Sequence, residues 1–95
     1  MIALSIAGSD PSGGAGIQAD LKTFSTLGIY GLTVISAITS QNTSKFSKVK
    51  EVSSDMMQSQ LESVLSDFNI DVINDHNKIL KNRCDMLFQL LKIYH

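Results

Sequence analysis

The sequence of 95 residues has no tryptophan, one proline, one cysteine and no glycine after Gly31. The lone Cys84 excludes an internal disulfide and fits a reducing compartment. The net charge of −1 excludes the basic surface that nucleic-acid binding requires. The longest weakly polar run, residues 29–38, is too short to cross a bilayer, and no basic segment precedes the apolar start. We therefore expect a cytoplasmic protein with neither nucleic acid nor membrane as a partner.

The composition of the sequence indicates one small folded domain whose two parts differ in charge and glycine content. Hydrophobic residues make up 43% of the chain and charged residues 18%, which is typical of a globular protein. The first 44 residues carry three charged side chains, whereas residues 45–95 carry fourteen. Because all six glycines fall in the first part as well, the search for a binding site starts there.

The first part of the chain has the pattern of a βαβ unit. The apolar residues 2–7 predict a buried strand, and the glycine-rich residues 8–16 predict a loop. An apolar face at helical spacing predicts a helix over 15–27, which Gly28 ends. The face comprises Ile17, Leu21, Phe24 and Leu27. The β-branched residues 32–38 predict a second buried strand. These two strands should be parallel.

The second part of the chain predicts shorter elements. Val49 and Val52 indicate a short strand, and Ser53 or Ser54 should cap a helix that runs to Asp67. The apolar face of that helix comprises Met57, Leu61, Val64, Leu65 and Phe68. Residues 70–73 predict a third strand, and residues 77–94 predict an amphipathic helix.

A glycine loop between a strand and a helix is typical of anion or ligand binding, so we compared it with two phosphate-binding patterns. Gly8 and Gly13 have the spacing of a P-loop, but Gly14 and Ala15 stand where Lys and Ser/Thr are required. Residues 14–19 match the dinucleotide-binding fingerprint only weakly, and residues 33–42 contain no acidic residue that could bind the ribose. The P-loop is excluded, and the dinucleotide site is a distant alternative.

Residues 6–24 read IAGSDPSGGAGIQADLKTF and closely resemble the N-terminal signature of the hydroxymethylpyrimidine/phosphomethylpyrimidine kinases. The resemblance continues through residues 27–31, 34–38 and 60–67 and covers about residues 2–73. A related branch acts on pyridoxal or pyridoxine and has a similar glycine loop. The triplet Gln41-Asn42-Thr43 favours the pyrimidine branch.

The resemblance implies a fold and a domain division. It implies an α/β fold, the N-terminal fragment of a ribokinase-like three-layer α/β/α sandwich with a mostly parallel sheet. Residues 1–73 are then the N-terminal part of a pyrimidine kinase domain, and residues 74–95 are a tail outside the family pattern that is expected to be helical. The ligand should bind at the carboxyl ends of the strands, as in open α/β sheets generally.

The resemblance also implies three substrate-binding residues. Gly8 matches the glycine whose backbone lies against the pyrimidine, and Asp20 matches the aspartate near its hydroxymethyl end. Gln41 matches the side chain that pairs with the amino and nitrogen edge of the ring, which needs both a donor and an acceptor. Taken alone, these residues also fit a turn glycine, a solvated helix residue and a polar loop residue.

The family reaction is phosphoryl transfer from MgATP to a small pyrimidine, first to its hydroxymethyl oxygen and then to the monophosphate. Its catalytic parts include a distal Gly-x-Gly-Cys anion hole, which a chain without glycine after Gly31 cannot form. Cys84 fits a small buried hydrophobe instead, and His76 and His95 are too isolated for a metal site. We therefore assign neither a catalytic residue nor a metal ligand.

The family pattern stops near residue 73, where Asn74-Asp75-His76 replaces an expected Lys-x-Gly-Met-like segment. We expect a truncated or frameshifted product that is inactive alone, with a genuine short homologue as the alternative. The competing function is a non-catalytic remnant or interaction module. Strands left uncovered predict weak stability or self-association.

Overall fold

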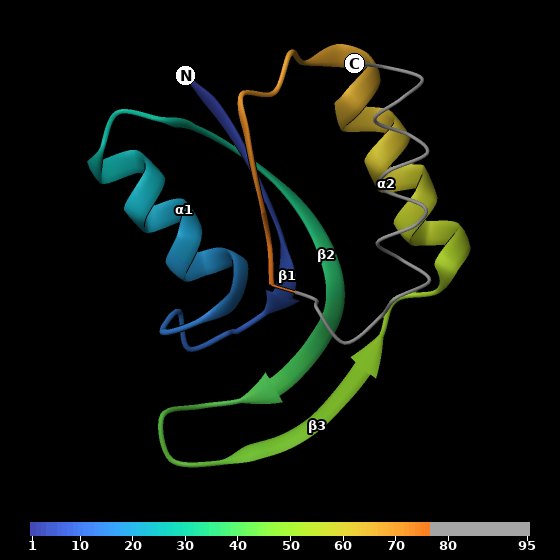
Figure 1. Ribbon diagram of the computed structural model, residues 1–95. Coiled ribbons are helices and arrows are strands. Elements are labelled where there is room, and N and C mark those ends of the chain that lie inside the picture. The colour runs from blue at the N-terminus through green and yellow to red at the C-terminus, as the bar shows by residue number, and fades with distance from the viewer. Residues whose placement is uncertain (77–95) are drawn as a thin grey trace.

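The computed structural model describes residues 1–76 as one sheet with a helix on each face (Figure 1). In chain order the elements are β1 (Ile2–Ser9), α1 (Gly16–Thr26), β2 (Tyr30–Gln41), β3 (Phe46–Glu51), α2 (Ser54–Asp67) and β4 (Val72–Asp75). The predicted helix over 77–94 lies outside the described residues, as do Cys84 and His95.

The sheet has the strand order β3-β2-β1-β4. β1 pairs in parallel with both β2 and β4, whereas β3 pairs antiparallel with the distal end of β2. The predicted parallel βαβ unit and the mostly parallel sheet are confirmed. β2 is longer than the predicted strand over 32–38, because residues 37–41 form a ladder with β3.

The last strand begins two residues later than predicted. Ile70 packs against the core before β4 starts, and Asp71 makes the connection to β1. The Asp71 backbone N–H donates to the Ile2 carbonyl (2.9 Å), and the Asp71 carboxylate accepts from the Ile2 N–H (2.8 Å). The apolar residues 70–73 therefore mark the approach to the sheet as well as the strand itself.

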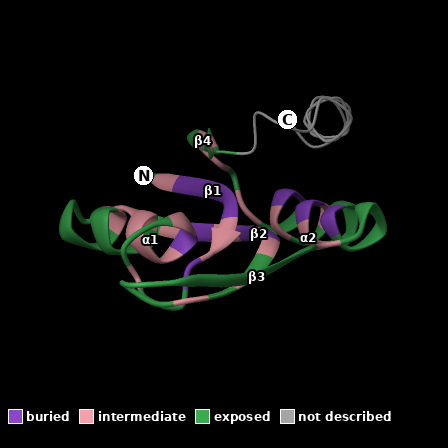
Figure 2. Ribbon diagram, turned by 90° about the horizontal axis from the view of Figure 1, so that it is seen from below, coloured by how far each residue is buried: buried purple, intermediate pink, exposed green. Residues whose placement is uncertain are grey.

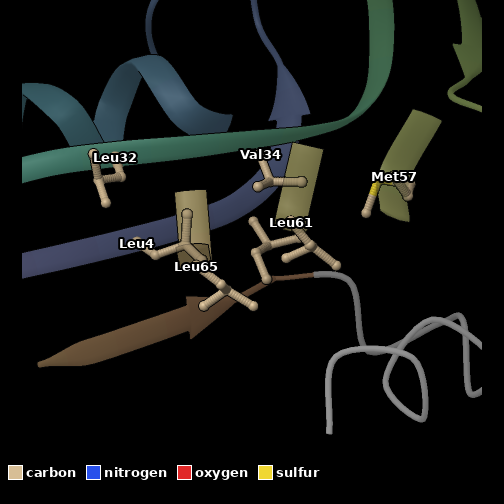
Figure 3. Close-up of a cluster of buried hydrophobic side chains, with 7 residues drawn as sticks. Leu4, Leu32, Val34, Met57, Leu61 and Leu65 are labelled. Atoms are coloured by element: carbon tan, nitrogen blue, oxygen red, sulfur yellow. The ribbon is translucent and has the colours of Figure 1, made fainter. Parts of the chain in front are cut away.

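The two helices cover opposite faces of β1 and β2 (Figure 2). Between α2 and the sheet lies the hydrophobic core, where three residues of α2 meet four residues of the two central strands (Figure 3). They are Met57, Leu61 and Leu65 from α2, and Leu4, Ile6, Leu32 and Val34 from the sheet. Burial of each large aliphatic side chain contributes about 1.5–3 kcal/mol. The apolar face predicted for α2 is confirmed, as is its cap, because the Ser53 side chain accepts from the Met56 N–H.

The α1 face of the sheet carries small residues that let the helix approach closely. Ala3, Ser5 and Ala7 of β1 are buried. On β2, a Cβ added at Gly31 would lie 2.8 Å from the Leu21 side chain. The prediction that Leu27 belongs to the buried face of α1 is wrong: it is 67% exposed, since the chain has already turned towards β2 there.

A glutamine of α2 completes the hydrogen bonding of β2. β3 pairs only with the distal part of β2, so one edge of β2 is open at Ile35. The Gln60 carboxamide accepts from the Ile35 N–H and donates to the Ile35 carbonyl, both at 2.9 Å. It thereby satisfies backbone groups that an open edge would expose. Within residues 1–76, neither helix is long and apolar enough to cross a membrane.

Candidate functional site

The carboxyl ends of the parallel strands bring two of the predicted site residues together. Gly8 lies near the end of β1 and Gln41 ends β2. The Thr39 hydroxyl links Gln41 to Ser9, the neighbour of Gly8, because it donates to the Ser9 carbonyl (2.7 Å) and accepts from Gln41 Nε2 (2.8 Å). The Gln41 side chain is therefore fixed to the β1 backbone next to Gly8.

The glycine loop is folded around the buried carboxylate of Asp10. Asp10 is 5% exposed, and one of its oxygens accepts from the backbone N–H (2.9 Å) and the hydroxyl (2.6 Å) of Ser12. These two hydrogen bonds, aided by the backbone N–H groups of Ala15 and Gly14, hold the pKa of Asp10 below its ordinary value of 3.8. The backbone N–H groups of the loop, which could otherwise bind an external anion, therefore donate to the Asp10 carboxylate.

No sequence motif predicted a role for Asp10, although the segment Asp10-Pro11-Ser12 carries a local signal. An aspartate two residues before a backbone N–H can form an Asx-turn. Gln18 then fastens the loop to β1, since its Oε1 accepts from the Asp10 N–H and its Nε2 donates to the Ser9 hydroxyl, both at 2.8 Å. These hydrogen bonds therefore hold the loop in a fixed position beside the ends of the strands.

Replacing Asp10 with asparagine should lower stability at neutral pH by an amount that shrinks in acid. Because the folded state lowers the pKa of Asp10, the carboxylate stabilises the fold fully above pH 3.8 and loses that contribution as the pH falls through the lower folded value. Urea unfolding of both chains at neutral and acidic pH measures the difference. Ser12→Ala, which removes the hydroxyl that donates to Asp10, should also reduce the difference in stability between neutral and acidic pH. A gap between wild type and Asp10→Asn that does not change with pH would contradict the stabilising role of the Asp10 carboxylate.

Gly16 allows α1 to begin against the end of β1. Its φ of +62° is in the left-handed region, and an added Cβ would lie 2.2 Å from the Gly8 carbonyl oxygen. Gly13 also has a positive φ, of +80°, whereas Gly14 does not, and an added Cβ at Gly14 would make ordinary contacts with the Asp10 and Ser12 side chains at 3.8 and 3.9 Å. The shape of the loop therefore requires glycine at residues 13 and 16, and the close packing of α1 requires it at residue 16.

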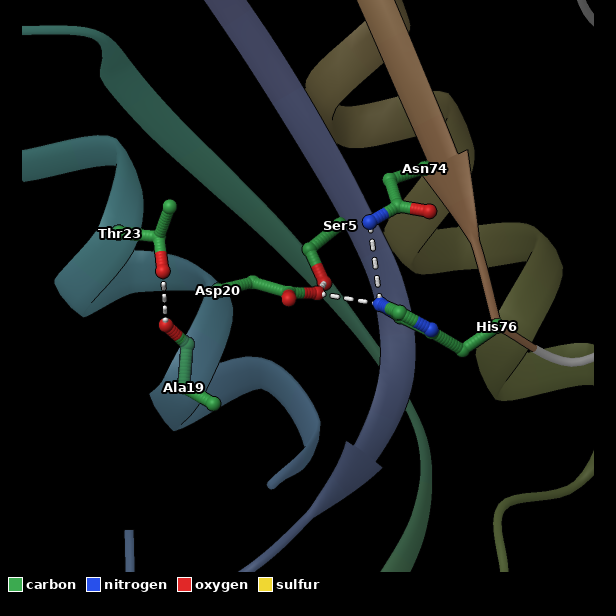
Figure 4. A network of polar contacts seen from close by, with 6 residues as sticks. All are labelled: Ser5, Ala19, Asp20, Thr23, Asn74 and His76. Carbon is green, nitrogen blue, oxygen red and sulfur yellow. Dashed lines mark hydrogen bonds and ion pairs between the residues drawn. The ribbon is translucent and has the colours of Figure 1, made fainter. Parts of the chain in front are cut away.

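Asp20 lies one turn into α1 and joins three elements. Its Oδ2 accepts from the Ser5 hydroxyl of β1 at 2.6 Å, and His76 Nε2, just beyond β4, lies 2.7 Å from the same oxygen (Figure 4). The Asp20 side chain is 18% exposed, so it is not the solvated helix residue that its sequence context alone suggests. His76, expected to be an isolated loop residue, is half-exposed and paired with Asp20.

The described residues leave this edge of the sheet open. A hollow of about 380 Å³ lies on the β2–β3 hairpin and shares only Thr39 with the linkage described above. In the same range, no group of three or more His, Cys, Asp or Glu side chains is arranged to hold a metal ion. The structure thus holds Gln41 beside Gly8 at the end of β1, whereas Asp20 is held at Ser5, in the middle of β1.

Comparisons with known proteins show what the chain is similar to. Residues 10–74 match the family model for phosphomethylpyrimidine kinase. Over 72 residues, 76% of the chain, the sequence is 57% identical to a hydroxymethylpyrimidine/phosphomethylpyrimidine kinase of Rhizobium meliloti. The crystal structure of phosphomethylpyrimidine kinase from Clostridium difficile superposes with a TM-score of 0.87 over 99% of the chain at 41% identity.

A pyridoxal kinase is also similar. The pyridoxal kinase of Staphylococcus aureus in complex with pyridoxal gives a TM-score of 0.83 at 34% identity over 99% of the chain. The chain spans 27% of the length of the Rhizobium meliloti relative, 41% of the Clostridium difficile chain and 36% of the Staphylococcus aureus chain. The predicted resemblance and the ribokinase-like α/β fold are confirmed: the chain belongs to the phosphomethylpyrimidine kinase family.

Proposed function

We propose that residues 1–73 form the substrate-binding part of a kinase that phosphorylates 4-amino-5-hydroxymethyl-2-methylpyrimidine and its monophosphate for thiamine diphosphate synthesis. In this reaction the substrate oxygen attacks the γ-phosphorus of MgATP, a new P–O bond forms, and ADP leaves. The 57% identity to a relative named for both activities supports the substrate class. A pyridoxal kinase solved with AMP-PCP supports ATP as the co-substrate.

The observation that carries the proposal is the fixed orientation of the Gln41 carboxamide. The Thr39 hydroxyl has one proton and donates it to the Ser9 carbonyl, so it must accept from Gln41, which identifies the group facing it as Nε2. Within residues 1–76, Gln41 Oε1 has no hydrogen-bond partner. Oε1 and the second Nε2 proton can pair with the amino group and ring nitrogen of an aminopyrimidine.

Gly8 supports the same substrate from the other side of the linkage. Its φ is not positive, and an added Cβ would lie 3.6 Å from the Ala37 carbonyl oxygen, an ordinary contact. The fold therefore tolerates a side chain at residue 8. A glycine there gives a flat ring access to the backbone, which suits a pyrimidine that stacks on it.

The described residues serve binding rather than phosphoryl transfer in this proposal. Catalysis of this kind depends on placing donor and acceptor in line and stabilising the charge that develops. Residues 1–76 place the acceptor through Gly8, Asp20 and Gln41. The glycine loop encloses Asp10 rather than a phosphate, so the nucleotide belongs elsewhere in the complete site.

Gln41→Ala should weaken binding of the hydroxymethylpyrimidine by about fivefold to thirtyfold, because one to two hydrogen bonds of about 1 kcal/mol each are lost. Isothermal titration of the full chain measures the dissociation constants. Ser40→Ala, an exposed neighbour on the same strand, is the matched control and should bind like wild type. Equal affinities for wild type and Gln41→Ala would overturn the proposed role of Gln41.

A pyridoxal-binding site is the second candidate, favoured by the likeness to the Staphylococcus aureus enzyme solved with pyridoxal. The same titration separates the two, since a pyrimidine site should prefer the aminopyrimidine to pyridoxal. Adding MgATP and measuring ADP tests turnover.

A further inference from the structure

Ser5 and Asp20 form a shielded polar contact between β1 and α1. Ser5 is fully buried in the middle of β1, between the buried Ala3 and Ala7 on the same face. Its hydroxyl lies 2.6 Å from Asp20 Oδ2, and because an ionised carboxylate only accepts, Ser5 is the donor. Such a charge-assisted bond is shorter and stronger than a neutral one, and its burial keeps water from replacing it.

The two oxygens of the Asp20 carboxylate have different surroundings. Oδ2 is held by Ser5 from the sheet and by His76 Nε2 from the end of β4 (Figure 4). Oδ1 has no hydrogen-bond partner within residues 1–76, where no buried side-chain oxygen lacks a partner. Oδ1 is therefore accessible. One oxygen is tied to the protein and the other is left for a ligand.

We infer that Ser5 is a positioning residue that fixes Asp20 so that Oδ1 can accept a hydrogen bond from the hydroxymethyl group of the substrate. This inference rests on the proposed function. A hydroxymethyl group can donate to Oδ1, whereas a methyl group in its place cannot and would desolvate the carboxylate without compensation. An Asp20 carboxylate held in place thus distinguishes a phosphate acceptor from an analogue without the hydroxyl.

The orientation of Asp20 depends more on Ser5 than on His76. His76 is 48% exposed, so water competes for its contact with Oδ2. Ser5 is completely shielded, and its strand is held by β2 on one side and β4 on the other. Without the Ser5 hydroxyl, the carboxylate keeps only the exposed contact, and its two oxygens can exchange positions.

The test compares two ligands on the full chain by titration calorimetry. They are 4-amino-5-hydroxymethyl-2-methylpyrimidine and 4-amino-2,5-dimethylpyrimidine, which lacks only the hydroxyl. Wild type should prefer the first by roughly tenfold to a hundredfold, the range expected for one hydrogen bond to a charged group. Ser5→Ala should reduce this ratio to near one, with affinity for the dimethyl compound unchanged, because the Gln41 contacts remain.

A matched pair keeps the inference testable if Ser5→Ala does not fold. Thr and Val have nearly the same shape and both suit a strand, but only Thr supplies a hydroxyl. Ser5→Thr should retain the preference and Ser5→Val should lose it. Ser36→Ala removes another buried serine, from β2, and should leave the ratio unchanged.

The outcomes separate the two proposals. A wild-type chain that binds neither pyrimidine overturns the proposed function and, with it, the role of Ser5. A wild type that prefers the hydroxymethyl compound, with the same ratio in Ser5→Ala or Ser5→Val, overturns the role of Ser5 alone. An equal fall of the ratio in Ser36→Ala also overturns it, since the effect would then follow from any buried serine.

Discussion

Replacing Gly16 with alanine should lower the free energy of unfolding by about 3 kcal/mol or more, a large part of the 5–15 kcal/mol typical of a domain. Gly16 has a φ of +62°, and an added Cβ would lie 2.2 Å from the Gly8 carbonyl oxygen. The Gly8 oxygen belongs to the backbone, so no flexible side chain can move to relieve the overlap. The start of α1 has to move away from the end of β1, which also disturbs Gln18 and Asp10.

Gly28→Ala is the matched control for this substitution. Gly28 ends α1 with a φ of +70°, but nothing lies within 4 Å of an added Cβ. It carries the left-handed backbone cost alone, about 1–2 kcal/mol. Urea unfolding followed by far-UV circular dichroism gives both values. Equal losses for Gly16→Ala and Gly28→Ala would show that the close approach at Gly8 does not exist in solution.

The order and type of the elements follow from local chemistry, which explains why the sequence predicts them well. Glycines that need a positive φ mark the loop before α1 and the end of α1, and Ser53 caps α2 through its own side chain. These features involve residues close together in the chain. The length of β2, in contrast, depends on residues farther along the chain. Its last residues are strand only because they pair with β3, whose residues are all exposed and show no apolar alternation.

The residues of the candidate site were likewise predictable from the sequence only in part. The resemblance placed Gly8, Asp20 and Gln41 in one site, and the structure joins Gln41 to Ser9, the neighbour of Gly8, through a threonine that no pattern indicated. The partners of Asp20 lie 15 and 56 residues away in sequence, at Ser5 and His76. Neither spacing is a helix or strand period. The packing of α1 on β1 brings Asp20 to Ser5, and the parallel placement of β4 beside β1 brings His76 to the same carboxylate.

The glycine loop and the side chains around it have different roles in the candidate site. Asp10 uses the loop amides to hold the loop in one shape, and Gln18 fixes that shape to β1. The loop therefore contributes rigidity rather than a phosphate cradle. In the function we propose, specific recognition rests on side chains with an accessible acceptor, Gln41 and Asp20, each held by a neighbouring hydroxyl.

Leu61→Ala should lower the free energy of unfolding by about 3 kcal/mol, within the 2–5 kcal/mol found for large-to-small changes in cores. Leu61 is 1% exposed and lies in the cluster that joins α2 to β1 and β2. Its removal leaves a cavity in the only large apolar layer of residues 1–76. The loss also loosens Gln60, one residue away, which completes the hydrogen bonding of Ile35.

Leu27→Ala is the control, because Leu27 is 67% exposed and its loss should cost less than about 0.5 kcal/mol. Urea midpoints and slopes of both variants decide the comparison. Since only folded chain binds substrate, Leu61→Ala should also weaken apparent pyrimidine affinity once its unfolded fraction is appreciable, with no change in preference for the hydroxymethyl group. Equal losses for Leu61→Ala and Leu27→Ala would mean that α2 does not pack on the sheet in solution, and β2 would then lose the support that places Gln41.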